Sequence, residues 1–150
     1  MNTLKKLFAY AVLLCGMALV NAACSKDSGK SYSASDIAGS WKLVDGYTVY
    51  HYGESAGKYS FAENGPEFDW VRLNLMLFIN GDGTGQSPTD YGHFSYTLKG
   101  SNLICVFEGD DYSETFTIKE LTEDKLVLYY KDVEDGWFDE EYDFQRVTVF

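Results

Sequence analysis

The fold is decided by the stretch Ile37-Ala38-Gly39-Ser40-Trp41-Lys42-Leu43-Val44, the first strand-like run after a polar segment. It opens with Gly-x-Trp, and at a period of two it places Trp41, Leu43, Tyr47 and Val49 on one face. Gly46 interrupts the run and predicts a bend or bulge. The strands expected downstream need this first strand as a closing partner.

The rest of the chain alternates strand-like runs with turn residues. Runs rich in Val, Ile, Thr, Tyr and Phe show period two, as in the face shared by Val71, Leu73, Leu75, Leu77 and Ile79. Turn signals separate these runs at Asn80-Gly81-Asp82-Gly83, Lys99–Asn102, Gly109–Asp111 and Thr122–Asp124. Seven or eight strands in hairpin order predict an all-β antiparallel meander, closed as a barrel or folded over as a sandwich.

The segment from Tyr50 to Trp70 departs from this pattern. It contains Gly53, Gly57, Gly65 and Pro66 and has no steady period. We expect a long loop with a short strand or a turn of helix. Loops of this length in a compact domain are often lids or binding loops.

The first 23 residues differ in character from the rest. Lys5 and Lys6 precede an uncharged apolar run from Leu7 to Val20, which is too short to cross a bilayer comfortably. Small residues follow at Ala22 and Ala23. A basic start, a short apolar core and small residues before a cleavage site predict a secretory signal peptide rather than a membrane anchor or a buried helix.

The sequence Val20-Asn21-Ala22-Ala23-Cys24 resembles the lipobox of bacterial lipoproteins. The resemblance implies cleavage before Cys24 and lipidation of its sulfur; a plain secretory signal with an incidental cysteine is the alternative. The expected organisation is a signal peptide over 1–23, a lipidated flexible linker over 24–36, and a domain over 37–150. The expected location is the bacterial outer membrane, facing the periplasm or exposed at the cell surface.

Cysteine usage and charge fit an exported, tethered domain. After removal of Cys15 and acylation of Cys24, Cys105 remains alone, so no internal disulfide is expected. Its apolar surroundings predict a small buried side chain rather than a nucleophile. The net charge of −11 becomes −13 when Lys5 and Lys6 leave with the signal. Such a charge excludes nucleic acid as a partner, and the lipid, not the charge, would hold the protein at the membrane.

Several segments together resemble bacterial lipocalin-like lipoprotein families. After the Gly39-Ser40-Trp41 opening come a strand ending in a Gly-rich hairpin, an aromatic strand and two leucine-containing strands. These segments are Phe78 to Gly85, Phe94 to Leu98, Ile118 to Thr122 and Leu126 to Leu128. The resemblance covers roughly residues 37–150 and implies an eight-stranded barrel. It also implies that Arg146 of the last strand covers Trp41 and closes the barrel base.

The polar motifs indicate neither a metal site nor catalysis. Asn80 to Gly85 matches the first positions of an EF-hand loop, but the twelfth position is Tyr91, so a β-hairpin is the better interpretation. His51 and His93 lack enough companions for zinc. The acidic clusters around Glu114 and Asp135 fall in turns, where carboxylates are solvated. We expect no cofactor, no metal and no enzymatic activity.

The chain is rich in aromatic residues, with 12 Tyr, 10 Phe and 3 Trp. If the barrel is not completely filled, aromatic walls with a few hydroxyls suit a small apolar ligand. The predicted ligand-binding residues are Tyr47, Phe68, Trp70, Leu75, Tyr96, Phe116 and Tyr130. The alternative is a filled barrel that docks another envelope protein, for which an exposed patch around Phe68, Trp70 and Trp137 would be expected.

Overall fold

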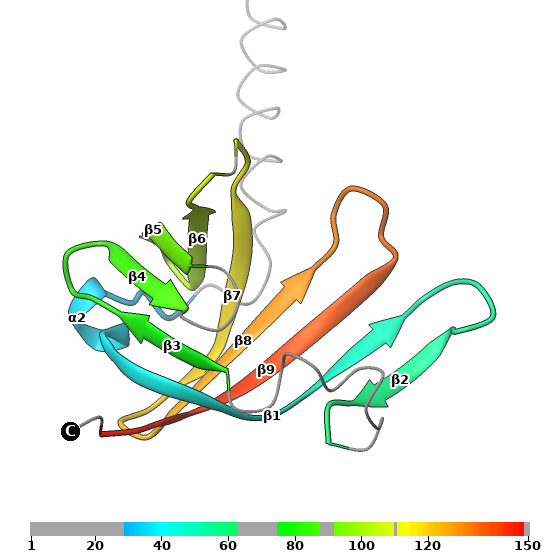
Figure 1. The fold of residues 1–150 in the computed structure, drawn as a ribbon, viewed down its shortest axis with the longest axis horizontal. Coiled ribbons are helices and arrows are strands. Elements are labelled where there is room, and N and C mark those ends of the chain that lie inside the picture. The colour runs from blue at the N-terminus through cyan, green and yellow to red at the C-terminus, as the bar shows by residue number, and fades with distance from the viewer. Residues whose placement is uncertain (1–28, 63–74, 88–91, 110, 149–150) are drawn as a thin grey trace, which may run out of the picture. The chain divides into compact units, whose positions relative to one another are not determined.

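The computed structural model describes residues 29–62, 75–87, 92–109 and 111–148. The compact unit that carries the strands begins at Ser31. Described elements are one short helix and nine strands (Figure 1): α2 (Ala34–Ile37), β1 (Gly39–Tyr50), β2 (Gly57–Ser60), β3 (Met76–Ile79), β4 (Thr84–Ser87), β5 (Gly92–Lys99), β6 (Asn102–Phe107), β7 (Glu114–Leu121), β8 (Lys125–Lys131) and β9 (Phe138–Arg146).

The strands form a closed antiparallel barrel. From β3 to β9 each strand pairs with the next, and β9 returns to pair with β1 along its length. The other edge of β1 pairs with β3 through Gly39–Lys42. The strands β1 and β3–β9 therefore close an eight-stranded meander, which confirms the predicted fold. Closure pairs each of these eight strands on both sides among the described residues, which protects the strand edges.

Strand β2 is not part of this ring and pairs only with the C-terminal part of β1. It pairs with Tyr47–Tyr50, on the same edge of β1 that pairs with β3 at its N-terminal residues Gly39–Lys42. This is the short strand expected between Tyr50 and Trp70; residues 63–74 lie outside the described part. Just after β2, the Phe61 amide donates to the Gly46 carbonyl at 2.9 Å, and the Phe61 ring is buried against Tyr142.

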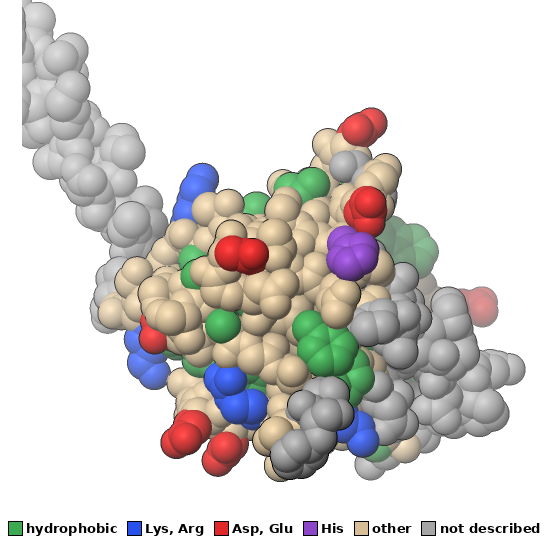
Figure 2. Space-filling model, turned by 60° about the vertical axis from the view of Figure 1, so that its left-hand side comes forward, with side chains coloured by type: hydrophobic (Ala, Val, Ile, Leu, Met, Phe, Trp, Pro, Cys, Tyr) green, Lys and Arg blue, Asp and Glu red, His purple; other side chains and the backbone are tan. Residues whose placement is uncertain are grey.

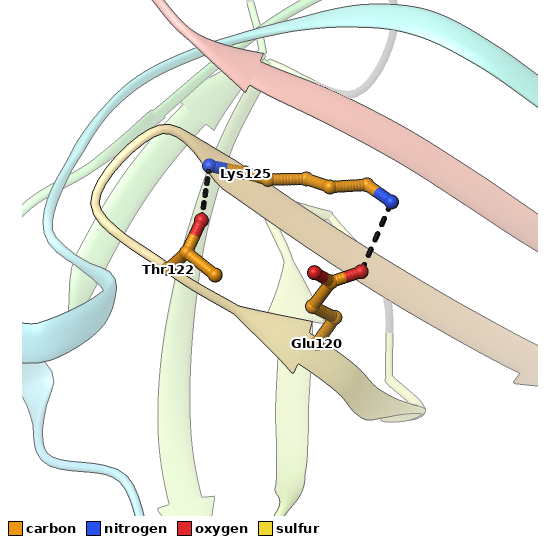
Figure 3. Close-up of polar contacts among 3 residues, drawn as sticks. All are labelled: Glu120, Thr122 and Lys125. Atoms are coloured by element: carbon orange, nitrogen blue, oxygen red, sulfur yellow. Dashed lines mark hydrogen bonds and ion pairs between the residues drawn. The ribbon is translucent and has the colours of Figure 1, made fainter.

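The strand directions define two different ends. At one end, here named the closed end, lie α2 and the β3–β4, β5–β6 and β7–β8 turns. At the other, the open end, lie the loops that follow β1, β6 and β8. Figure 3 shows the β7–β8 turn, where the Lys125 amide donates to Thr122 Oγ1 at 3.0 Å. Lys125 Nζ also pairs with Glu120 across the hairpin at 3.0 Å.

Helix α2 lies in the segment assigned to the flexible linker, and here the structure differs from the expectation. Ser33 and Asp36 form a capping box that stabilises this single turn. Ile37, the last residue of this turn, is fully buried, and Tyr32 and Ala34 pack against the core. The compact domain therefore starts at Ser31, about six residues before Ile37. The capping box and the burial of apolar side chains stabilise this segment although most of its residues are polar.

The inward face of β1 changes along the strand. Its register against β9 shifts between Leu43 and Asp45, so the bulge lies just before Gly46. Beyond it the buried residues are Gly46 and Thr48, the latter at 3 % exposure, and Tyr47 points to the outer face. The prediction that Tyr47 and Val49 share the face of Trp41 is therefore wrong, because one extra residue reverses the alternation.

Candidate functional site

The open half of the barrel encloses a cavity of about 210 Å³. Its walls come from β3 to β9, and most of its lining side chains are aliphatic or aromatic. The lining residues are Leu75, Leu77, Ser87, Phe94, Leu103, Cys105, Phe107, Glu114, Phe116, Leu128, Tyr130, Phe138, Glu140, Tyr142 and Phe144. An apolar cavity with few polar groups is the usual form of a small-molecule site.

Strand β4 explains why space remains there. Its two buried residues are Gly85 and Ser87, so this wall carries almost no side-chain volume. A Cβ at residue 85 would collide with the Phe94 ring, which occupies the space in front of the glycine. Ser87, two residues further along the strand, lines the cavity, so the cavity reaches β4 there.

The opposite wall is aromatic. The ring centroids of Phe116 and Tyr130 are 5.5 Å apart, those of Tyr130 and Phe138 5.9 Å, and those of Phe116 and Tyr142 6.4 Å. These separations lie in the range in which aromatic pairs stabilise one another. A ligand would therefore meet a preformed aromatic surface on β7, β8 and β9.

Two carboxylates interrupt the apolar lining. Glu140 is 4 % exposed and accepts hydrogen bonds from Thr48 Oγ1 at 2.8 Å and from the Tyr142 hydroxyl. Glu114 stands at the first position of β7. Burial raises the pKa of Tyr130, and the negative charge of Glu114 raises it further. The phenol of Tyr130 is therefore a neutral hydrogen-bonding group at ordinary pH.

Cys105 lines the same cavity as a protonated thiol. It is 3 % exposed, and burial raises its pKa to about 12, with a smaller contribution from the charge of Glu114. The thiolate is the nucleophilic form of cysteine. Cys105 therefore contributes a weakly polar wall and no nucleophile near neutral pH.

The structure brings only some of the predicted ligand residues together. Leu75, Phe116 and Tyr130 line the cavity. Tyr96 is buried in the core but does not line the cavity, and its hydroxyl donates to the Asn80 carbonyl at 2.5 Å. Phe68 and Trp70 lie outside the described residues, as does the lipidation candidate Cys24.

Tyr47 does not belong to the cavity. On the outer face its hydroxyl donates to Glu141 at 3.1 Å, and Lys58 Nζ lies 3.5 Å from its ring centroid. Sequence reasoning instead missed Phe107, Phe138 and Tyr142, which do line the cavity. The period of two in Phe138-Asp139-Glu140-Glu141-Tyr142 was a usable signal, since Phe138, Glu140 and Tyr142 all face inward.

At the closed end the structure places Arg146 over Trp41. The guanidinium carbon lies 4.2 Å from the ring centroid, and Arg146 Nη1 donates to the Ala38 carbonyl at 2.8 Å. Trp41 is fully buried, and its Nε1 donates to the Ile37 carbonyl at 2.9 Å. Gly39 makes this possible, because a Cβ there would collide with the guanidinium. The arrangement closes the base of the barrel.

The other polar candidates have local structural roles. His51 Nε2 lies 3.1 Å from Asp139 Oδ2, and His93 is exposed on β5. Asp82 accepts hydrogen bonds from the amide and hydroxyl of Thr84 within the β3–β4 turn. Within the described ranges no group of three His, Cys, Asp or Glu side chains is arranged to hold a metal ion. In the same ranges no helix is long and apolar enough to cross a membrane.

The outer surface carries mixed side chains. On the face in Figure 2, charged and hydrophobic groups are scattered among polar ones, with one small hydrophobic group beside a histidine. Trp137 is 55 % exposed in the β8–β9 loop. The patch expected for a docking module combined Trp137 with Phe68 and Trp70, which are not described. The cavity also differs from the completely filled barrel of that alternative.

The closed antiparallel meander has an apolar cavity at one end and an arginine-covered tryptophan at the other, and an eight-stranded barrel of this size has room for one small ligand. The chain matches the family model of the lipocalin-like domain over residues 37–128, more than half its length, and it belongs to that family. Neither the curated proteins nor the solved structures contain a match to it.

Proposed function

We propose that this protein is a lipid-anchored protein of the bacterial cell envelope that binds a small apolar ligand inside its barrel without catalysing a reaction. The cavity of about 210 Å³ carries the proposal, because its lining is mainly aliphatic and aromatic. An apolar cavity of about 150 Å³ binds benzene in another protein. This cavity therefore has room for one aromatic ring with a short chain.

Binding without catalysis is supported by the state of the cavity's polar groups. The Cys105 thiol is protonated near neutral pH, since burial raises its pKa to about 12. Glu140 is held by the hydroxyls of Thr48 and Tyr142, which fix its orientation. The Cys105 thiol is also unsuited to proton transfer, because that role needs a pKa near the working pH.

Native mass spectrometry of residues 31–150 tests ligand binding directly. We expect a retained mass that disappears after lipid extraction, or binding of an apolar fluorescent probe by the extracted protein. Ser87→Leu should abolish this signal, because it adds side-chain volume to the cavity. Ser95→Leu is the matched control, since Ser95 is exposed on the outer face of β5. The proposal fails if no probe binds or if both variants behave alike.

The lipid anchor and the envelope location rest on the sequence. Ala22-Ala23-Cys24 follows a short apolar run, and the net charge of −11 disfavours nucleic acid and anionic lipid surfaces as partners. Metabolic labelling with a radioactive fatty acid in a bacterial host should mark the wild type and Cys15→Ser but not Cys24→Ser. Equal labelling of all three proteins would contradict lipidation at Cys24.

A further inference from the structure

Ser87 is a polar residue of the cavity lining whose hydroxyl is buried without a hydrogen-bond partner in the described residues. It is the last residue of β4, is 2 % exposed and lines the cavity. Its Oγ is fully buried and has no hydrogen-bond partner in the described part of the chain. Buried hydroxyls are nearly always paired, so an unpaired one on a residue that lines a cavity indicates a missing partner.

We propose that Ser87 is the polar anchor of the cavity, and that the ligand is an apolar molecule carrying one uncharged hydroxyl or carbonyl group that hydrogen-bonds to Ser87 Oγ. This inference rests on the proposed function and adds the chemical class of the ligand. The serine hydroxyl both donates and accepts, so it pairs with either group.

The surroundings of Ser87 favour an uncharged partner. Leu77 of β3, Phe94 of β5 and Leu75 just before β3 line the cavity next to β4. A single hydroxyl does not compensate for the burial of an ion among such side chains. The charged side chains in the described lining are Glu114 and Glu140, and like charges repel an anionic ligand.

The barrel order also gives the ligand an orientation. In the ring of eight strands β4 lies four strands from β8 in either direction, so Ser87 faces the wall that carries Tyr130. A ligand that spans the cavity places its polar group at Ser87 and its apolar body against Phe116, Tyr130 and Phe138. These three rings form consecutive contacts at 5.5 and 5.9 Å.

A bound water is the competing explanation for an unpaired buried hydroxyl. Water needs two to four polar partners to remain in a cavity. Close to Ser87 the lining is aliphatic and aromatic, and the two carboxylates belong to β7 and β9. A ligand that brings its own apolar body and one polar group fits this distribution better. The two explanations predict different responses to a ligand with and without a hydroxyl.

The test compares 2-phenylethanol with propylbenzene, which has a methyl group in place of the hydroxyl. Binding to the full chain in phospholipid nanodiscs is followed through the methyl NMR signals of the cavity leucines, with empty nanodiscs as blanks. We expect Ser87→Ala to weaken 2-phenylethanol binding about tenfold and propylbenzene binding by less than about twofold. Ser95→Ala should change neither, and Ser87→Thr should retain the preference for the alcohol.

Each other result overturns the proposal in a recognisable way. Equal effects of Ser87→Ala on both probes, or no effect, would mean that Ser87 does not recognise the hydroxyl and that water or nothing occupies its place. A clear fall in the melting temperature of Ser87→Ala would reveal a structural partner for the hydroxyl. Failure of both probes to bind the wild type would overturn the proposed ligand binding itself, and with it the role of Ser87 as the polar contact.

Discussion

The two ends of the barrel use the same alternating strands for different purposes. At the closed end the interior is filled: Trp41 and Leu126 are fully buried and Leu43 is 1 % exposed. At the open end the interior is shared between small residues on β4 and partly exposed rings on β7 to β9, and a cavity remains. Side-chain volume, rather than strand pairing, separates the two ends.

The comparison shows how one barrel combines stability with binding. The closed end joins distant parts of the chain, because Arg146 contacts Trp41, the Ala38 carbonyl and the Glu123 carbonyl. The side chains at the open end are packed less tightly, and a cavity remains between them. Binding regions are often drawn from the less stable parts of a fold. We therefore expect mutations at the closed end to affect folding first and mutations at the open end to affect binding first.

The largest effect is expected for Trp41→Ala. The substitution removes a fully buried indole, its hydrogen bond to Ile37 and the surface on which Arg146 lies. Loss of a buried Trp or Phe side chain costs about 3–5 kcal/mol. Urea unfolding of residues 31–150 should show a loss of this size.

Phe116→Ala provides the matched change at the open end. Phe116 is only partly buried and already borders the cavity, so we expect a smaller loss of about 1–2 kcal/mol. Probe binding should weaken or change in preference. Equal losses of stability for the two variants would contradict the contrast between the ends.

The second largest effect concerns Cys105 and alkaline pH. Its folded pKa is about 12 against an ordinary value of 9.0, so the unfolded chain loses the thiol proton first. The contribution of the thiol to stability is complete below pH 9 and is lost as the pH rises from 9 towards 12. At pH 10.5 the loss from this one group is about 2 kcal/mol.

The Cys105→Ala variant isolates this contribution from that of the tyrosines. Burial also raises the pKa values of Tyr96 and Tyr130, which destabilise both proteins in the same alkaline range. The difference in unfolding free energy between wild type and variant should therefore narrow steadily above pH 9. A constant difference from pH 8 to pH 11 would show that the Cys105 thiol is not shielded by the fold.

A third, smaller effect is expected for Arg146→Lys. Lysine keeps the charge but loses the planar group that lies on Trp41 and donates to two carbonyls. We expect a loss of about 1–2 kcal/mol and unchanged probe binding, since Arg146 does not line the cavity. Thermal unfolding and probe titration together measure both quantities. If Arg146→Lys weakened probe binding and left stability unchanged, the closed end would serve binding rather than stability, contrary to our assignment.

Much of the fold, and less of the site, followed from the sequence. Period two and the turn signals predicted the meander, and the Gly-x-Trp opening together with Arg146 indicated the contact at the closed end. These features are local or rest on a resemblance. Leu75, Phe116 and Tyr130 were also selected correctly as inward-facing residues.

The errors in the predicted site arise where one extra residue shifts the strand register, or where contacts between distant residues determine the position of a side chain. Gly46 indicated a bend or bulge, but the sequence did not show that an extra residue between Leu43 and Asp45 would move Tyr47 to the outer face. Tyr96 faces inward as predicted but donates to Asn80 in the core. The cavity itself depends on the small Ser87 lying across the barrel from large rings, which only the three-dimensional arrangement reveals.

The smallest effect is expected for Glu120→Gln, which tests whether the closed end owes its stability to its interior or its surface. The Glu120–Lys125 pair in Figure 3 spans 3.0 Å, but both side chains are nearly half exposed. Water and salt screen such a pair, and holding two long side chains together costs entropy. The melting temperature should therefore change by no more than about 2 °C at low salt and still less at high salt. A drop as large as that of Arg146→Lys would mean that the β7–β8 hairpin surface, and not the tryptophan beneath it, holds the closed end together.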